Sequence, residues 1–192
     1  MSQRAFTSAA NRYARTWVER EEDLALGLRA IDRATRLGSL QRCAGYFRIA
    51  RNFPTRFDLD RELPRLDPVL AILDTLRFPL RSDHLIDIVE RTSERLASVY
   101  GKKGLLSAAT KLLWLMHKDP VVIYDSQVRA SLRVPPGNYA AYVSRWHALY
   151  SQHAAGIRRA TSRIGVPGAP VEGEWFRRRV FDLYLWAEGV PS

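Results

Sequence analysis

The 192-residue chain contains a single cysteine, Cys43. One cysteine can form neither a disulfide within the chain nor a cysteine-rich zinc site or a four-cysteine iron–sulfur cluster. The four histidines (His84, His117, His147 and His153) show no HExxH motif or similar ligand spacing. We therefore expect no metal ion and no other cofactor.

Long hydrophobic runs are also missing. No apolar segment approaches the roughly 20 residues that span a bilayer, and residues 1–6 lack the apolar core of a signal peptide. Neither a basic amphipathic tail nor a lipidation motif occurs. Hydrophobic residues make up 46% of the sequence, which is enough for a folded core in a chain of this length. We expect a cytoplasmic, monomeric globular protein without a membrane partner.

Acidic residues are absent from residues 126–171, a segment that holds six arginines. The formal net charge is +10, of which residues 1–100 contribute +3 and residues 101–192 contribute +7. A general preference for arginine over lysine would not explain the missing carboxylates. A segment of one sign attracts polyanions and gains affinity by releasing their condensed counterions. The sequence therefore predicts a nucleic acid as the partner.

Helical periodicity dominates the chain, and no convincing strand pair or internal repeat occurs. We expect an all-α fold of about seven or eight helices in one or two closely packed lobes, taken as a single domain, 1–192. A loop broken by prolines is expected over residues 52–64. The expected helices cover residues 4–37 (one or two helices ended by Gly38), 39–50 (capped by Ser39), 66–76, 82–100, 105–117, 125–132, 139–164 and 175–188.

Two charged side chains in residues 101–133 are candidates for chemistry. Lys111 is the only charge in residues 105–116, and Asp125 follows an apolar run at a predicted helix start. An ionised carboxylate beside a helix N-terminus could stabilise a sugar cation and orient an attacking water. A desolvated lysine could attack the sugar carbon and form a Schiff base. On residue type alone, a solvent-facing lysine and an ordinary helix cap are the commoner roles.

The order of these features resembles the helix-hairpin-helix DNA glycosylase superfamily. A lysine-bearing helix is followed by a proline break, an apolar run and an aspartate that begins the next helix. Thr110-Lys111 matches the lysine of the bifunctional members, and residues 122–125 (VIYD) match the shared catalytic aspartate. Residues 181–186 (FDLYLW) fit a closing helix of some compact relatives. Residues 107–110 (SAAT) replace the usual Gly-x-Gly, and the lysine-to-aspartate spacing is shorter than in bifunctional members.

The resemblance implies a DNA glycosylase that flips a modified base out of double-stranded DNA, cleaves its N-glycosidic bond and leaves an abasic site. Asp125 would act alone in a monofunctional hydrolase, or Lys111 would add lyase activity. The compact size is similar to bacterial phage-defence glycosylases. That analogy implies an antiviral role and a hypermodified phage base such as glucosylated hydroxymethylcytosine. The alternative is a non-catalytic helical nucleic-acid-binding protein in which Asp125 only caps a helix.

Further residues are candidates for contacts with DNA. A glycosylase holds the flipped base against aromatic groups, although core packing is the commoner role of such side chains. The candidates for the base pocket or wedge are Tyr124, Trp114 and Trp186. Phosphates could be bound by glycine-flanked lysines, by hydroxyls near a helix start and by arginines after Asp125, or these could form a solvated basic face. These phosphate-contact candidates are Lys102, Lys103, Ser107, Thr110, Arg129 and Arg133.

Overall fold

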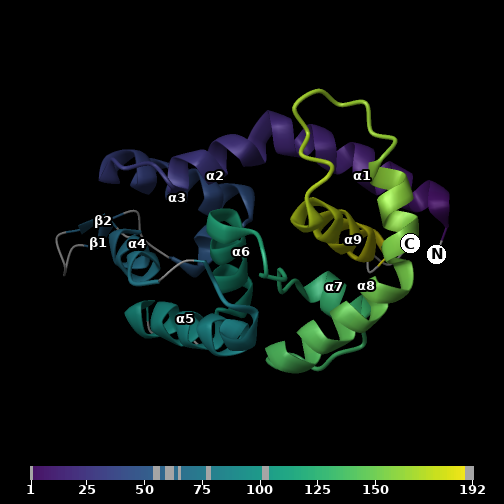
Figure 1. Ribbon diagram of the computed structural model, residues 1–192. Helices are drawn as coiled ribbons and strands as arrows, with labels where there is room; N and C mark the ends of the chain where they lie inside the picture. Colours follow the sequence, from purple (N-terminus) through teal and green to yellow (C-terminus); the bar gives the residue numbers. More distant parts are fainter. Residues whose placement is uncertain are drawn as a thin grey trace. The chain divides into compact units, whose positions relative to one another are not determined.

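The computed structural model describes residues 2–53, 57–58, 63–64, 66–76, 79–100 and 104–188, and the fold is all-α (Figure 1). With α1 and α2 counted as one helical run, the described residues form eight α-helices, as expected. Those helices are α1 (Gln3–Thr16), α2 (Glu22–Leu28), α3 (Arg33–Tyr46), α4 (Asp67–Asp74), α5 (Leu85–Tyr100), α6 (Leu106–His117), α7 (Ser126–Ser131), α8 (Tyr139–Thr161) and α9 (Glu174–Glu188). None of the described helices combines the length and apolar character required to cross a membrane.

The N-terminal helix departs from the expected pattern. A π-helical turn, Trp17–Glu21, joins α1 to α2, and the run ends at Leu28 instead of near Gly38. The Asp32 carboxylate begins α3 by accepting a hydrogen bond from the Thr35 N–H at 2.7 Å. The helix then continues through Gly38, where the surroundings are open.

Ser39 is consequently not a helix cap. It lies inside α3 and is buried, and an added Cβ at Gly27 would meet its hydroxyl oxygen at 1.9 Å. The prediction of a helix start at Ser39 was wrong because this serine packs against the glycine of α2. A close approach of two helices often depends on a glycine at the contact.

The chain forms two compact units. We call Met1–Glu22 together with Val122–Ser192 the N/C unit, and Asp23–Val121 the middle unit. The boundary divides residues 101–133, which the sequence analysis treated as one catalytic segment of a single domain. Lys111 belongs to the middle unit and Asp125 to the N/C unit.

In the N/C unit, α1 packs against both α8 and α9. Aromatic rings fill the space between these helices. Tyr13 and Phe176 have ring centroids 4.8 Å apart, and the pair Trp146 and Phe181 lies at 5.2 Å. All four side chains are fully buried, so this cluster forms the core on which α7 and α9 are positioned.

In the middle unit, α6 packs against α5, and α4 contacts both α3 and α5. Most of α6 is buried, which is consistent with its nearly uncharged sequence. The helix ends where Lys118 adopts a positive φ of 49°, two residues before Pro120. Within the expected loop 52–64, the two-residue strands β1 (Phe57–Asp58) and β2 (Leu63–Pro64) pair antiparallel.

Candidate functional site

Asp125 begins α7, as the sequence predicts. Its Oδ1 accepts a hydrogen bond from the Gln127 N–H at 3.0 Å, and its backbone carbonyl accepts one from the Arg129 N–H at 2.8 Å. The residue as a whole is half-buried. One carboxylate oxygen is thus held by the helix start in a residue that is partly accessible to solvent.

The backbone that leads into Asp125 is fixed by buried tyrosines. The Tyr139 hydroxyl donates to the Val122 carbonyl at 2.8 Å, and the Tyr142 hydroxyl donates to the Ile123 carbonyl at 2.7 Å. Both tyrosines are fully buried on α8. Because their rigid rings carry the hydroxyls, the extended segment 122–124 is held at two successive carbonyls.

Tyr124 itself adds a third hydrogen bond that holds this segment. Its hydroxyl accepts a hydrogen bond from the Gly137 N–H at 2.9 Å, and its ring packs edge-on against Tyr142 with a centroid distance of 4.9 Å. Tyr124 is only 8% exposed. In this structure Tyr124 therefore supports the segment before Asp125. This is the core-packing role that was the alternative to a place in the base pocket.

The two α8 tyrosines keep their protons. Burial raises the pKa of Tyr142 well above its ordinary value, and the negative charge of Asp182 raises it further, while a backbone hydrogen bond with Asp125 acts in the opposite direction. Burial likewise raises the pKa of Tyr139, and Asp182 adds to the shift. Both hydroxyls consequently remain hydrogen-bond donors to the segment at neutral pH.

A buried ionic cluster lies within the same unit. Arg179 is bonded to Asp182 and lies 3.9 Å from the Glu21 carboxylate, which also accepts a hydrogen bond from the Tyr13 hydroxyl at 3.1 Å. Glu21 and Asp182 are both buried, at 0% and 4% exposure. The negative charge of Asp182 also acts on Tyr139 and Tyr142, whose pKa values it raises.

The sequence analysis did not identify Tyr139, Tyr142 or Asp182. A signal was present for Asp182, because it is the single charge in the apolar residues 181–186. A carboxylate inside an apolar stripe requires a buried partner. Nothing comparable marks the two tyrosines, which contact the segment from 17 and 19 residues later in the chain.

Lys111 is half-buried on α6 of the middle unit. Since Asp125 lies in the other unit, a joint action of the two side chains remains a prediction. Thr110, the neighbour of Lys111, is fully buried, and its hydroxyl donates to the Leu106 carbonyl at 2.9 Å. The prediction of a phosphate contact by Thr110 is therefore wrong in this conformation, because the hydroxyl is occupied inside the helix.

The remaining predicted DNA residues differ in exposure. Trp114 is 3% exposed and packs in the core, which disfavours a wedge role, whereas Trp186 is 41% exposed. Ser107 is half-buried. Lys102 and Lys103 lie outside the described residues. Of the three candidates for the base pocket or wedge, only Trp186 therefore has a ring that is accessible to solvent.

The arginines of residues 126–171, all in the N/C unit, lack acidic partners among the described residues. Arg129 donates to the Val134 carbonyl at 2.7 Å, and Arg133 is exposed with a φ of 54°. Within the part of the chain that the structure describes, no arginine of residues 126–171 forms an ion pair with a carboxylate. In the middle unit, by contrast, Arg33 pairs with Asp67. The unbalanced positive charge thus lies on α7, on α8 and in the loop that follows it.

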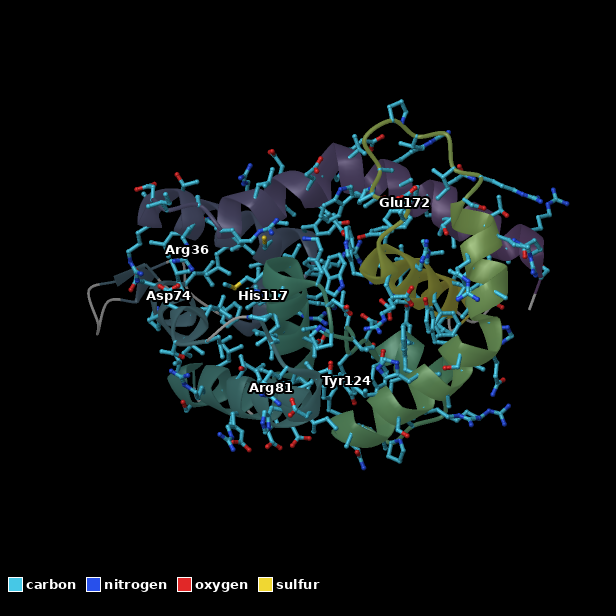
Figure 2. All side chains as sticks on the ribbon, viewed as in Figure 1. Arg36, Asp74, Arg81, His117, Tyr124 and Glu172 are labelled. Atoms are coloured by element: carbon cyan, nitrogen blue, oxygen red, sulfur yellow. The ribbon has the colours of Figure 1, made fainter. Side chains whose placement is uncertain are left out.

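The middle unit also contains a pocket of about 320 Å³. Figure 2 labels Arg36, Asp74 and His117, which line it and come from α3, α4 and α6. Arg36 is bonded to Asp74, so these charges offset each other. Burial lowers the pKa of His117 to about 3, and the positive charge of Arg29 acts in the same direction, so this imidazole is neutral at physiological pH.

In the described part of the chain, no group of three or more His, Cys, Asp or Glu side chains is placed to hold a metal ion. No family model matches this sequence, and no curated protein or solved structure matches it either.

Proposed function

We propose that the protein is a DNA glycosylase in which Asp125 is the catalytic carboxylate. The observation that carries this proposal is the way the side chain is held. The carboxylate of the half-buried Asp125 caps α7 by accepting a hydrogen bond from the Gln127 N–H. The segment before it is held at two carbonyls by the hydroxyls of buried Tyr139 and Tyr142. Preorganised charge of this kind stabilises a transition state without reorganisation at the moment of reaction.

The reaction would break the bond between C1′ of the deoxyribose and the base nitrogen, with both bonding electrons leaving on the base. The carboxylate of Asp125 stabilises the positive charge that develops on the sugar. It also orients a water whose oxygen forms the new bond to C1′, while the water proton passes to Asp125 and then to solvent or to the departing base. The products are a free base and an abasic site.

A covalent variant of this reaction would use Lys111. After losing its proton, the amine would attack C1′ in place of water, and the bond from C1′ to the base would break with its electrons leaving on the base, which takes a proton from solvent. The C1′–O4′ bond would then open, with an amine proton passing to O4′, to leave a Schiff base at C1′ that adds lyase activity. Borohydride reduction traps such an intermediate. A covalent DNA adduct that disappears in Lys111→Gln supports this route, and cleavage without any adduct assigns hydrolysis to Asp125 alone.

The substrate proposed here is double-stranded DNA that carries a modified base, including the hypermodified bases of phage DNA. The arginines of α7 and α8 support DNA as the partner, because they carry positive charge without acidic partners among the described residues. A mass-spectrometric search for released bases, with DNA of ordinary and hypermodified composition, identifies the base.

The decisive variant is Asp125→Asn. Asparagine caps helices about as well as aspartate, so the fold should persist. Base release should fall by roughly 10²- to 10⁴-fold, the usual contribution of a positioned acid–base or charge-stabilising group. DNA binding should survive, because a negative charge is removed from the interface.

A matched control exists in Asp32→Asn. Asp32 also caps a helix, by accepting from the Thr35 N–H at 2.7 Å, but it lies exposed at the start of α3. This substitution changes the charge and cap chemistry in the same way and should leave base release unchanged. Equal activity of Asp125→Asn and the wild-type protein refutes the catalytic assignment.

A second candidate function is nucleic-acid binding without catalysis. It is favoured by one observation, namely that Asp125 makes the hydrogen bond of an ordinary helix cap. In that case no DNA releases a base, Asp125→Asn leaves binding nearly intact, and affinity falls steeply with salt.

A further inference from the structure

One face of α8 carries exposed arginines near both of its ends. Arg145, Arg159 and Arg163 are all exposed, Arg163 lying just beyond the end of the helix. At 3.6 residues per turn, these three positions fall within about 40° of one another around the axis. They therefore form a row about 27 Å long, from the 1.5 Å rise per residue. We call these three residues the arginine row.

Small side chains border the arginine row. The exposed α8 residues on one side of it are Ser144, Ala148, Ser151 and Ala155. None of them projects far from the helix, so a bulky partner can approach the backbone of α8 closely. Arg158 extends the positive charge of this face toward the helix end.

The arginine row differs from an ordinary solvated helix face. Exposed helices usually alternate charges of both signs, as α5 does where Arg91 lies 4.0 Å from Asp87 one turn earlier. Among the described residues, none of the three row arginines has a carboxylate partner. Arginines near a helix C-terminus can stabilise the helix dipole. That role does not account for Arg145, which lies in the first third of α8.

We propose that the arginine row binds the phosphate backbone of double-stranded DNA, as a contact surface beyond the Asp125 site. This inference rests on the proposed function, since it extends the surface on which the substrate lies. Both strands wind around the duplex axis, and each presents a phosphate about every 3.4 Å along it. Arginines about 21 Å and about 6 Å apart along α8 can therefore contact phosphates of the two strands on either side of a groove. Such contacts add affinity and orientation, but no sequence preference.

The chemistry of this face favours DNA over a membrane surface or a protein. A membrane-binding helix requires large apolar side chains opposite or between its basic residues, whereas the exposed residues within and beside the row are glutamine, serine and alanine. Protein interfaces depend on aromatic anchors in their centre, and this face has none among its described exposed residues. Positive charge on a flat surface is the complement of a phosphate chain.

The test compares two triple variants of the full-length protein. The first is Arg145→Gln/Arg159→Gln/Arg163→Gln. The control is Arg42→Gln/Arg81→Gln/Arg91→Gln, which removes the same charge from exposed arginines that each pair with an aspartate in the middle unit. Binding to a fluorescently labelled duplex of ordinary bases is measured by anisotropy between about 50 and 200 mM salt. In this range phosphate contacts dominate the change in affinity. Circular dichroism verifies that both variants fold.

Each phosphate contact contributes about −0.9 to the slope of log affinity against log salt. The row variant should therefore lower the magnitude of that slope by up to about 2.7, and the control should leave it unchanged. Equal slopes for both variants overturn the proposal. Loss of binding to phosphatidylserine vesicles by the row variant, with DNA binding intact, overturns it in favour of a membrane surface.

The same experiment separates this inference from the glycosylase proposal. Asp125→Asn should lower base release by roughly 10²- to 10⁴-fold and keep the wild-type salt slope. If Asp125→Asn instead retains activity while the row variant shows a smaller salt slope, the catalytic assignment fails and the proposal for the arginine row stands. If it loses activity while the row variant keeps its slope, the arginine row fails and the catalytic assignment stands.

Discussion

The hydroxyl of Tyr142 provides a sharp test of how the Asp125 segment is held. Tyr142→Phe removes one oxygen and keeps the ring, which packs against Tyr124 at a centroid distance of 4.9 Å. The lost bond is the 2.7 Å donation to the Ile123 carbonyl. Because the Ile123 carbonyl accepts this bond from a buried hydroxyl, the substitution leaves a buried acceptor without its donor. The free energy of unfolding should therefore fall by about 1–3 kcal/mol.

The effect on activity should exceed the effect on stability. The Ile123 carbonyl lies two residues before Asp125, so a freed segment lets the carboxylate move away from the reacting sugar. Misplacement of a catalytic group by about 1 Å costs on the order of 10²-fold in rate. We expect Tyr142→Phe to lower kcat/KM of base release by at least 10-fold in the folded protein.

Tyr150→Phe is the matched control. Tyr150 lies on the same helix and donates its hydroxyl to the Glu174 carboxylate at 2.6 Å, away from residues 122–125. Its removal should cost a similar free energy, about 1.5–3 kcal/mol for a bond to a charged group, without lowering base release. Urea denaturation measures stability, and single-turnover assays measure the chemical step. Equal activity of the two variants would show that Tyr142 stabilises the fold without positioning Asp125.

Two further predictions concern the middle unit. With its pKa lowered to about 3 by burial and by Arg29, the folded imidazole of His117 should not titrate by NMR above pH 5. In the unfolded chain His117 takes up a proton near pH 6.5, so the free energy of unfolding should fall as the pH drops from 6.5 toward 3. The fall should be smaller in His117→Gln. An NMR titration of the folded imidazole near pH 6.5 contradicts the prediction. Gly27→Ala should destabilise by about 1–3 kcal/mol, because the new Cβ would lie 1.9 Å from the buried Ser39 hydroxyl. Gly38→Ala, in open space within α3, should stabilise by about 0.5–1 kcal/mol; similar thermal shifts for both would refute the packing argument.

Local signals predicted the second half of the fold well. The breaks at Pro120 and at residues 133–138 bound α7, and the prediction of a helix over 139–164 differs from α8 by three residues at its end. Asp125 was predicted as a cap because an aspartate directly after an apolar run has one strong local role. These features depend on the residues next to them, so the sequence is sufficient.

The first half shows where local signals compete. Asp32, Gly38 and Ser39 each could begin or end a helix. The outcome was decided by tertiary packing, because Ser39 fits against Gly27 of the preceding helix. A single sequence contains no information on that approach, and the same limit hid the tyrosines that hold the Asp125 segment.

A comparison of the two aspartate caps argues for a function at Asp125. Asp32 caps α3 at an exposed position, and its pKa is lowered by the hydrogen bond from Thr35. Asp125 makes the same kind of cap, yet its segment is tied by two buried hydroxyls and by Tyr124.

Capping alone requires none of this. The cluster of Glu21, Arg179 and Asp182 is buried in the same unit, where well-packed apolar residues would often be equally or more stable. Departures from local consistency are expected at functional sites. The buried hydroxyls of Tyr139 and Tyr142 that hold residues 122–123, more than the cap itself, favour catalysis at Asp125 over simple DNA binding.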